Sequence, residues 1–238
     1  MQGRVGIVLA MESEAAPFGL SHPPVDVPIA LNERCRLYVG GIGPAAAQRA
    51  AQALCADGVV ALASFGVAGA LDPGLRAGAL LAPHRVVDER GQGFDADAGW
   101  HARLLARLQQ NTLAAQTAPL LSSASTQATA AAKQARYEGD AIAVDMESAA
   151  VAAVARDAGL PFLALRAVTD EAHVALPSAV LDAIDAYGRT QAFALLRALG
   201  ASPSAALSLP RLGLAFARAR RKLATALRHS GPDLAWSA

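Results

Sequence analysis

Short apolar runs alternate with alanine-rich stretches along most of this chain, and this alternation constrains the fold more than any other feature. Several runs are almost continuously apolar, which is typical of strands that are covered on both faces. Strands alternating with helices at this spacing predict a single three-layer αβα domain with a mixed, mostly parallel central sheet. We expect strands at 4–10, 35–41, 58–66, 78–87, 118–124, 141–146 and 161–169, and helices at about 44–57, 96–110, 127–137, 146–158 and 178–199.

The end of the chain differs in charge from the rest. Residues 1–185 carry 13 Lys/Arg and 19 Asp/Glu, a net charge of −6, whereas residues 186–238 carry 8 and 1, a net charge of +7. We therefore divide the chain into a domain at 1–199 and a C-terminal part at 200–238. The second part consists of a linker, "GASPSAALSLP" (200–210), and a basic amphipathic helix at 211–229.

The predicted C-terminal helix has one apolar side. Its apolar residues follow 4-3-4-4 spacing, which places them within a narrow sector of a helical wheel: Leu212, Phe216, Ala219, Leu223 and Leu227. Two interpretations remain open. The helix packs on the domain or on a partner subunit, or it lies on an anionic membrane surface, held there by its cations. Nucleic acid is a poorer partner, because no aromatic residues interleave with the cations and the whole chain is near neutral.

Composition excludes several classes of protein. With 53% hydrophobic and 17% charged residues the chain can bury a large core, so it is not a disordered protein. No apolar run reaches the roughly 18 residues that a membrane span requires. The apolar run near the N-terminus is short and acids follow it, which indicates a first strand rather than a secretory signal. Cys35 and Cys55 have no metal-site or disulfide spacing, so we expect a reduced cytoplasmic protein without a metal.

Acidic side chains directly follow the first, sixth and seventh predicted strands: Glu12 and Glu14, Asp145 and Glu147, and Asp170. Each has a structural interpretation, because acids cap helices and complement the dipole of a first helical turn. In folds of this class, however, ligands bind beyond the carboxyl ends of the strands. We therefore expect Glu14, Glu147 and Asp170 to meet at one edge of the sheet. His173 has no second ligand at metal spacing, and we interpret it as a surface or packed histidine.

Two glycine-rich turns separate these acids. "GGIGP" (40–44) opens a predicted helix, whose free amides can hold an anion, so Gly43 is a candidate phosphate or ribose contact. The turn also fits G-x-G-x-x-A, but no acid ends the next strand to bind a ribose hydroxyl, which argues against a dinucleotide site. The second turn begins at "FGVAG" (65–69), where Gly66 and Gly69 would let the backbone approach a flat ligand. A simple bend after the strand is the alternative.

The three acids and the glycine-rich turns between them together indicate a reaction, which none of them indicates alone. Three acids from different strand ends suit chemistry that protonates a leaving group and stabilises an oxocarbenium-like sugar. Glu147 suits the sugar itself, because a carboxylate offers two oxygens to a pair of adjacent hydroxyl groups.

These residues resemble the superfamily of nucleoside phosphorylases and methylthioadenosine/S-adenosylhomocysteine nucleosidases. "GIVLAMESEAAPF" (6–18), "GGIGPAAAQRAA" (40–51) and "FGVAGALDPGLRAGALL" (65–81) are similar to its first three signatures, with Ala79 in place of a final Asp. "AVDMESAAVAAVARDAGLPFLALRAVTD" (143–170) resembles the fourth and fifth signatures at their usual distance. The ending "DEAHVALPSAVLDAIDAYGR" (170–189) looks most like the hopanoid-associated phosphorylases, which remove adenine from adenosylhopane.

The resemblance implies a role for each matched residue. Asp170 would donate a proton to purine N7, and an Asp there suits a 6-amino purine. Met146 and Glu147 would hold the ribose, and Glu14 would position the nucleophile. Asp145 and Arg166 would be supporting residues, with Arg166 orienting Asp145. The base would lie against Gly66, Val67, Ala68 and Gly69, where Val67 replaces the serine of the nucleosidases.

The nucleophile is not fixed by any motif. The hopanoid branch implies inorganic phosphate as co-substrate and no other cofactor, with the Gly43 amide as a contact and with cations available at Arg34, Arg36 and Arg49. The first alternative is a methylthioadenosine/S-adenosylhomocysteine nucleosidase that uses water. The second is a non-catalytic nucleoside-binding or lipid-associated protein. The resemblance also implies a homodimer, and a lipid-linked adenine nucleoside as substrate would suit a protein at the periphery of the inner membrane.

Overall fold

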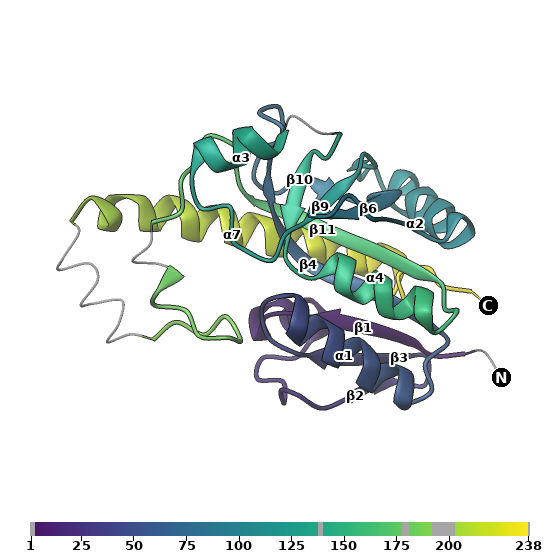
Figure 1. The fold of residues 1–238 in the computed structure, drawn as a ribbon. Helices are drawn as coiled ribbons and strands as arrows, with labels where there is room; N and C mark the ends of the chain where they lie inside the picture. Colours follow the sequence, from purple (N-terminus) through teal and green to yellow (C-terminus); the bar gives the residue numbers. More distant parts are fainter. Residues whose placement is uncertain (1–2, 138–139, 178–180, 192–202, 238) are drawn as a thin grey trace.

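The central element of the fold is one mixed β-sheet (Figure 1). A computed structural model describes residues 3–137, 140–177, 181–191 and 203–237. The sheet is parallel at its centre, where β3 (Cys35–Val39), β1 (Val5–Leu9), β4 (Ala61–Ala70) and β11 (Phe162–Asp170) lie side by side. Shorter strands extend it on both sides: β2 (Ile29–Asn32), β5 (Leu80–Leu81), β6 (Arg85–Asp88), β7 (Gly93–Asp95), β8 (Ala115–Gln116), β9 (Leu120–Ser122) and β10 (Ala143–Asp145).

Helices cover both faces of this sheet. One face packs against α1 (Pro44–Ala56) and α4 (Ser148–Asp157), and the other against α2 (Ala98–Gln110) and α7 (Pro203–Ser230) (Figure 1). The start of α1 follows from its sequence, because Gly43 adopts a φ of 100° and Pro44 occupies the first helical position. The predicted three-layer α/β fold with a mixed, mostly parallel sheet is confirmed.

The seven predicted strands are all present, with three differences from the prediction. The run at 78–87 is divided into β5 and β6, because Pro83 between them has no N–H to donate to a neighbouring strand. The strand expected at 58–66 begins later and continues to Ala70 as β4. The short strands β2, β7 and β8 were not predicted, since two to four residues are too few for a periodic pattern.

The helix predicted at 178–199 is wrong over residues 182–191. Leu181 is helical, but residues 182–191 form turns and an isolated bridge between Ile184 and Thr190, while 178–180 and 192–199 lie outside the described residues. The Asp185 carboxylate accepts hydrogen bonds from the amides of Tyr187 and Arg189, and Gly188 adopts a φ of 75°. These contacts stabilise a turn in place of a helix. Two further helical elements lie earlier in the chain, the 3-10 helix η1 (Glu12–Phe18) and α3 (Ala130–Tyr137).

Helix α7 is longer than the predicted 211–229. The segment taken as a linker is helical from Pro203 onward, and residues 200–202 lie outside the described residues. The apolar residues Ala219, Leu223 and Leu227 are buried in the core beside Trp100 of α2. The packing interpretation therefore holds for this half of the helix. In the described part of the chain, no helix combines the length and the apolar character needed to cross a membrane.

Candidate active site

The three predicted acids line one pocket of about 560 Å³. Glu14 comes from η1 after β1, Glu147 follows β10, and Asp170 ends β11. All three side chains are buried within the protein. Of the other residues predicted at the site, Met146, Asp145, Val67, Ala68 and Gly69 also line the pocket.

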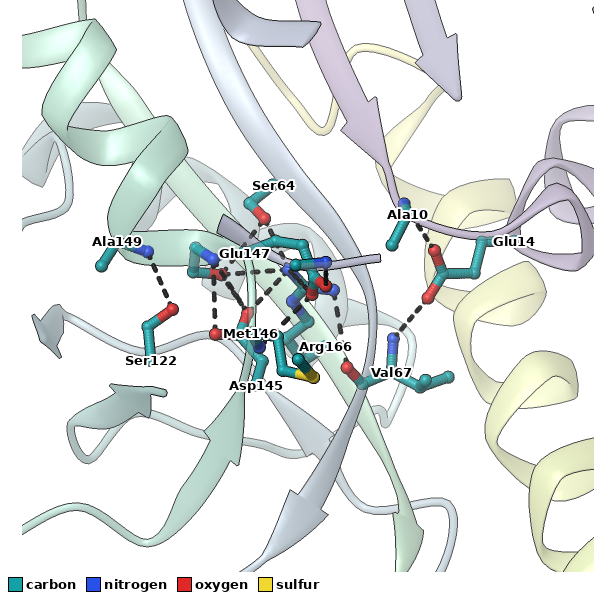
Figure 2. A network of polar contacts seen from close by, with 12 residues as sticks. Ala10, Glu14, Ser64, Val67, Ser122, Asp145, Met146, Glu147, Ala149 and Arg166 are labelled. Atoms are coloured by element: carbon teal, nitrogen blue, oxygen red, sulfur yellow. Dashed lines mark hydrogen bonds and ion pairs between the residues drawn. The ribbon is translucent and has the colours of Figure 1, made fainter. Parts of the chain in front are cut away.

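Glu14 is held by three backbone amides. Its Oε2 accepts hydrogen bonds from the N–H groups of Ala10 and Met11, both at 3.0 Å, and its Oε1 accepts one from Val67 at 3.0 Å (Figure 2). Burial raises the pKa of the Glu14 carboxyl, while the nearby Arg166 guanidinium and these amides oppose that rise. The arrangement fixes the carboxylate at the pocket wall and holds it ready to accept a proton.

Arg166 is the cation at the centre of this acidic group. It is 1% exposed, pairs with Asp145 at 2.7 Å, and lies 3.7 Å from the Glu147 carboxylate (Figure 2). The guanidinium also donates to Ser64 Oγ at 2.6 Å. Asp145 accepts hydrogen bonds from the amide of Ser148, the first residue of α4. Asp145 thus joins the buried arginine to the start of a helix.

Glu147 lies between Arg166 and the turn before α1. Its Oε1 accepts a hydrogen bond from the Gly43 amide at 2.9 Å. Burial raises the pKa of Glu147 to about 7, with Arg166 opposing and Asp145 and Glu14 adding to the rise. The Gly43 amide, predicted as a phosphate contact, is therefore engaged by Glu147.

Gly66 and Gly69 have different surroundings. Gly66 does not line the pocket, and a Cβ there would lie 2.2 Å from Glu14 Oε1 and 2.6 Å from Arg166. The missing side chain makes room for that carboxylate and guanidinium. A Cβ at Gly69 would lie 3.0 Å from Asp170 Oδ2, at the pocket surface. Both glycines therefore leave room for carboxylates, Gly66 for Glu14 and Gly69 for Asp170, and their close approach to a ligand stays a prediction.

Asp170 is paired with a residue that the sequence reasoning missed. Lys133 of α3 is 1% exposed, and its Nζ forms an ion pair with Asp170 Oδ2. The same ammonium donates to the carbonyl oxygens of Glu171 and Val174, each at 3.0 Å. Thr169 Oγ1 donates to Asp170 Oδ1 at 2.8 Å. Both oxygens of the carboxylate are thus held in place.

Much of the remaining pocket wall is apolar, although Ser125, Thr126, Gln127 and Thr190 also line it. Its apolar side chains come from the turn after β3, the segment after β11 and the first half of α7: Ile42, Leu176, Leu181, Ile184, Leu209, Leu212 and Phe216. Ile42 adjoins Gly43, whose amide binds Glu147, so the apolar wall begins beside that carboxylate. The pocket can therefore hold a polar group at Glu147 and Asp170 and an apolar group beyond them.

The cations proposed for phosphate lie elsewhere. Arg34 pairs with Asp233 at 2.8 Å and Arg36 with Asp57 at 3.0 Å, and neither these nor Arg49 lines the pocket. Within the described ranges, no group of three His, Cys, Asp or Glu side chains is placed to hold a metal ion.

Comparison with known proteins gives the family. A family model described as the phosphorylase superfamily matches residues 4–199. A search of curated proteins finds no match. Among solved structures, the chain is similar to the methylthioadenosine/S-adenosylhomocysteine nucleosidase of Campylobacter jejuni, with 20% identity, a TM-score of 0.64, and coverage of 82% of this chain and 95% of that one.

Two further structures are similar over nearly their whole length. The futalosine hydrolase of Helicobacter pylori has 18% identity and a TM-score of 0.64, covering 95% of this chain and 97% of that one. The S-adenosylhomocysteine nucleosidase of Streptococcus pyogenes, solved with 5-methylthiotubericidin, has 19% identity and a TM-score of 0.66, covering 94% and 96%. At this identity the likeness to these structures establishes the fold. The family model covers most of the chain, and the protein therefore belongs to the phosphorylase superfamily.

Proposed function

We propose that this protein cleaves the N-glycosidic bond of an adenine nucleoside that carries a large apolar group on the 5′ side of its ribose. The observation that carries the proposal is the pocket itself, in which Glu14, Glu147 and Asp170 share one cavity with an apolar wall. The similar solved structures include nucleosidases that act on adenosine derivatives, and this supports the same class of reaction.

The three acids divide the work of such a reaction. Asp170 protonates N7, so that adenine leaves as a neutral base when the C1′–N9 bond breaks. Glu147 accepts hydrogen bonds from the 2′ and 3′ hydroxyl groups, with Met146 packed beside the sugar. Glu14 holds the nucleophile against the sugar cation, and its raised pKa suits a group that takes up a proton there.

The apolar wall supports a lipid-like substrate. Ile42, Leu212 and Phe216 offer no hydrogen-bonding side chain to a sugar or amino acid. An apolar 5′ group would bury against them with a gain of about 25 cal/mol per Å² of apolar surface removed from water. Adenosylhopane, which the sequence resemblance implies, is the substrate that we expect.

Charge favours water as the nucleophile. Four carboxylates line the pocket, at Glu14, Asp145, Glu147 and Asp170. The only cations that contact them from the described residues are Lys133 and Arg166. The amides of Gly43 and Val67 already donate to carboxylates. A phosphate anion would find both cations already paired with carboxylates and these two amides engaged.

Phosphate remains the second candidate, because the ending at 170–189 resembles the hopanoid-associated phosphorylases. The deciding experiment measures adenine release from adenosylhopane, methylthioadenosine and adenosine, each with and without phosphate. We expect adenosylhopane to be cleaved fastest, to a free ribosyl product, at a rate independent of phosphate. A phosphate-dependent rate with a phosphoribosyl product would establish the second candidate. Failure to release adenine from any of the three would refute the proposed function.

Membrane contact and a homodimer stay predictions. The exposed cations of α7 lie opposite its packed apolar side: Arg211, Arg218, Arg221, Lys222 and Arg228. Because Leu223 and Leu227 are already buried in the core, this half of the helix would touch an anionic bilayer through charge alone.

A further inference from the structure

Lys133 is the one buried lysine described near the site, and its environment is unusual for that residue type. Lysine is almost never fully buried unless it is paired. Here its ammonium has three acceptors, the Asp170 carboxylate and the carbonyl oxygens of Glu171 and Val174. An ammonium has three protons to donate, so its hydrogen bonding is complete. Lys133 therefore has no proton left for a direct bond to substrate and acts through Asp170.

From this geometry we infer that Lys133 is a positioning residue that supplies the proton for the departure of adenine. The inference rests on the proposed function. With Lys133 as ammonium and Asp170 as carboxylate, the pair contains one transferable proton, and it lies between Nζ and Oδ2. Thr169 holds the other carboxylate oxygen, so the carboxylate cannot turn freely. An isolated carboxylate facing N7 would have no proton to give.

The step is balanced as follows. The C1′–N9 bond breaks and its electron pair passes into the purine ring. One proton moves from Lys133 Nζ to Asp170 Oδ2 and from Asp170 to N7, which leaves neutral adenine, a carboxylate and a lysine amine. Water attacks C1′ and gives its proton to Glu14. After the products leave, Glu14 releases that proton to solvent and Lys133 takes one up.

The same helix offers a matched control. Arg136 of α3 pairs with Glu89 at 2.9 Å, in a more exposed contact that does not involve Asp170. If Lys133 served only to anchor α3, its loss would slow the cleavage of all substrates alike, whether or not their leaving group needs a proton. If Lys133 acts through Asp170, only its own loss changes the departure of adenine.

The test compares two leaving groups in Lys133→Gln and Lys133→Met. One substrate is whichever adenine nucleoside the wild type cleaves, and the other is 4-nitrophenyl β-ribofuranoside, whose nitrophenolate departs without a proton. For the adenine nucleoside we expect kcat/KM to fall by roughly 10²-fold, as for Asp170→Asn, and for the nitrophenyl riboside by less than about threefold. Arg136→Met should stay within about threefold of wild type on both substrates.

Four results would overturn the inference. Equal losses on both substrates in the Lys133 variants would make Lys133 structural, and normal adenine release would remove it from the reaction. Lys133→Arg keeps the charge, but its guanidinium does not release a proton, so full activity in that variant would also refute proton supply. If wild type cleaves the nitrophenyl riboside but no adenine nucleoside, the proposed function fails first, and the inference fails with it.

Discussion

The pocket has two parts that differ in how they are built. The floor consists of Glu14, Val67–Gly69, Asp145–Glu147 and Asp170, with Arg166 buried among the carboxylates. The cover consists of Lys133 of α3 with Leu209, Leu212 and Phe216 of α7. Backbone amides and one buried arginine hold Glu14, Asp145 and Glu147, whereas Asp170 is held by Thr169 and by Lys133 of the cover. The floor, joined by Lys133 through Asp170, is thus suited to the chemistry, and the α7 side chains of the cover are suited to the choice of substrate.

The largest expected effect tests whether the floor also holds the fold together. Arg166→Met would leave Asp145 and Glu147 buried without their cation, and we expect the free energy of unfolding to fall by about 3–5 kcal/mol. Urea denaturation at neutral pH measures this. The control is Arg156→Met, because Arg156 pairs with Asp157 at the surface and should change stability by no more than about 0.5 kcal/mol. Equal effects of the two substitutions would show that the floor does not depend on Arg166.

The floor could be predicted from the sequence because it follows from topology. Acids that follow parallel strands lie at one edge of a sheet, and this rule holds for Glu14 and Asp170, which follow β1 and end β11 beside β4. Glu147 joins them because β10 runs antiparallel to the end of β4 and so leads back to the same edge. The α/β fold could also be predicted from the sequence, because buried strands are continuous apolar runs.

The cover could not be predicted in the same way. Lys133 stands alone in "ATAAAKQARY" (128–137), where a lone lysine in an alanine-rich helix looks like any solvated residue. Only the position of α3 over β11 brings it to Asp170. The apolar residues of α7 could not be assigned for a different reason, because one apolar stripe packs in the core along part of the helix and lines the pocket along another part. Ala219 and Leu223 pack in the core, while Leu212 and Phe216 line the pocket. Periodicity reveals the stripe but not where along the helix its use changes.

A second test concerns the charge of the floor. Glu147 has a pKa of about 7 in the folded protein and an ordinary value of 4.5. Between these values the folded state binds a proton that the unfolded state has lost. This contribution to stability is complete below about pH 4.5 and is lost as the pH rises through 7. Relative to wild type, Glu147→Gln should therefore gain about 1–3 kcal/mol of unfolding free energy between about pH 5 and 8.

Urea denaturation of both proteins across this range provides the measurement, and parallel curves would contradict the raised pKa. The same titration predicts that wild type binds its nucleoside more tightly at about pH 8 than at 6, because the ionised carboxylate accepts both ribose hydroxyl groups. Glu147→Gln should lose this pH dependence. A pH dependence that persists in the variant would assign it to another group.

The smallest expected effect distinguishes the cover from the floor. Leu212 lines the pocket, whereas Leu214, two residues later on α7, is 49% exposed and does not. Truncation of Leu212 to Ala removes apolar contact worth about 1 kcal/mol, so KM for a substrate with a long apolar 5′ group should rise by roughly fivefold. Leu214→Ala should change neither KM nor kcat. Because the contact is the same in the bound substrate and in the transition state, kcat should stay constant. Adenosine has no apolar 5′ group, so its KM should not respond. An equal rise for adenosine would mean that Leu212 only supports the shape of the pocket, and the apolar group would then have to bind elsewhere.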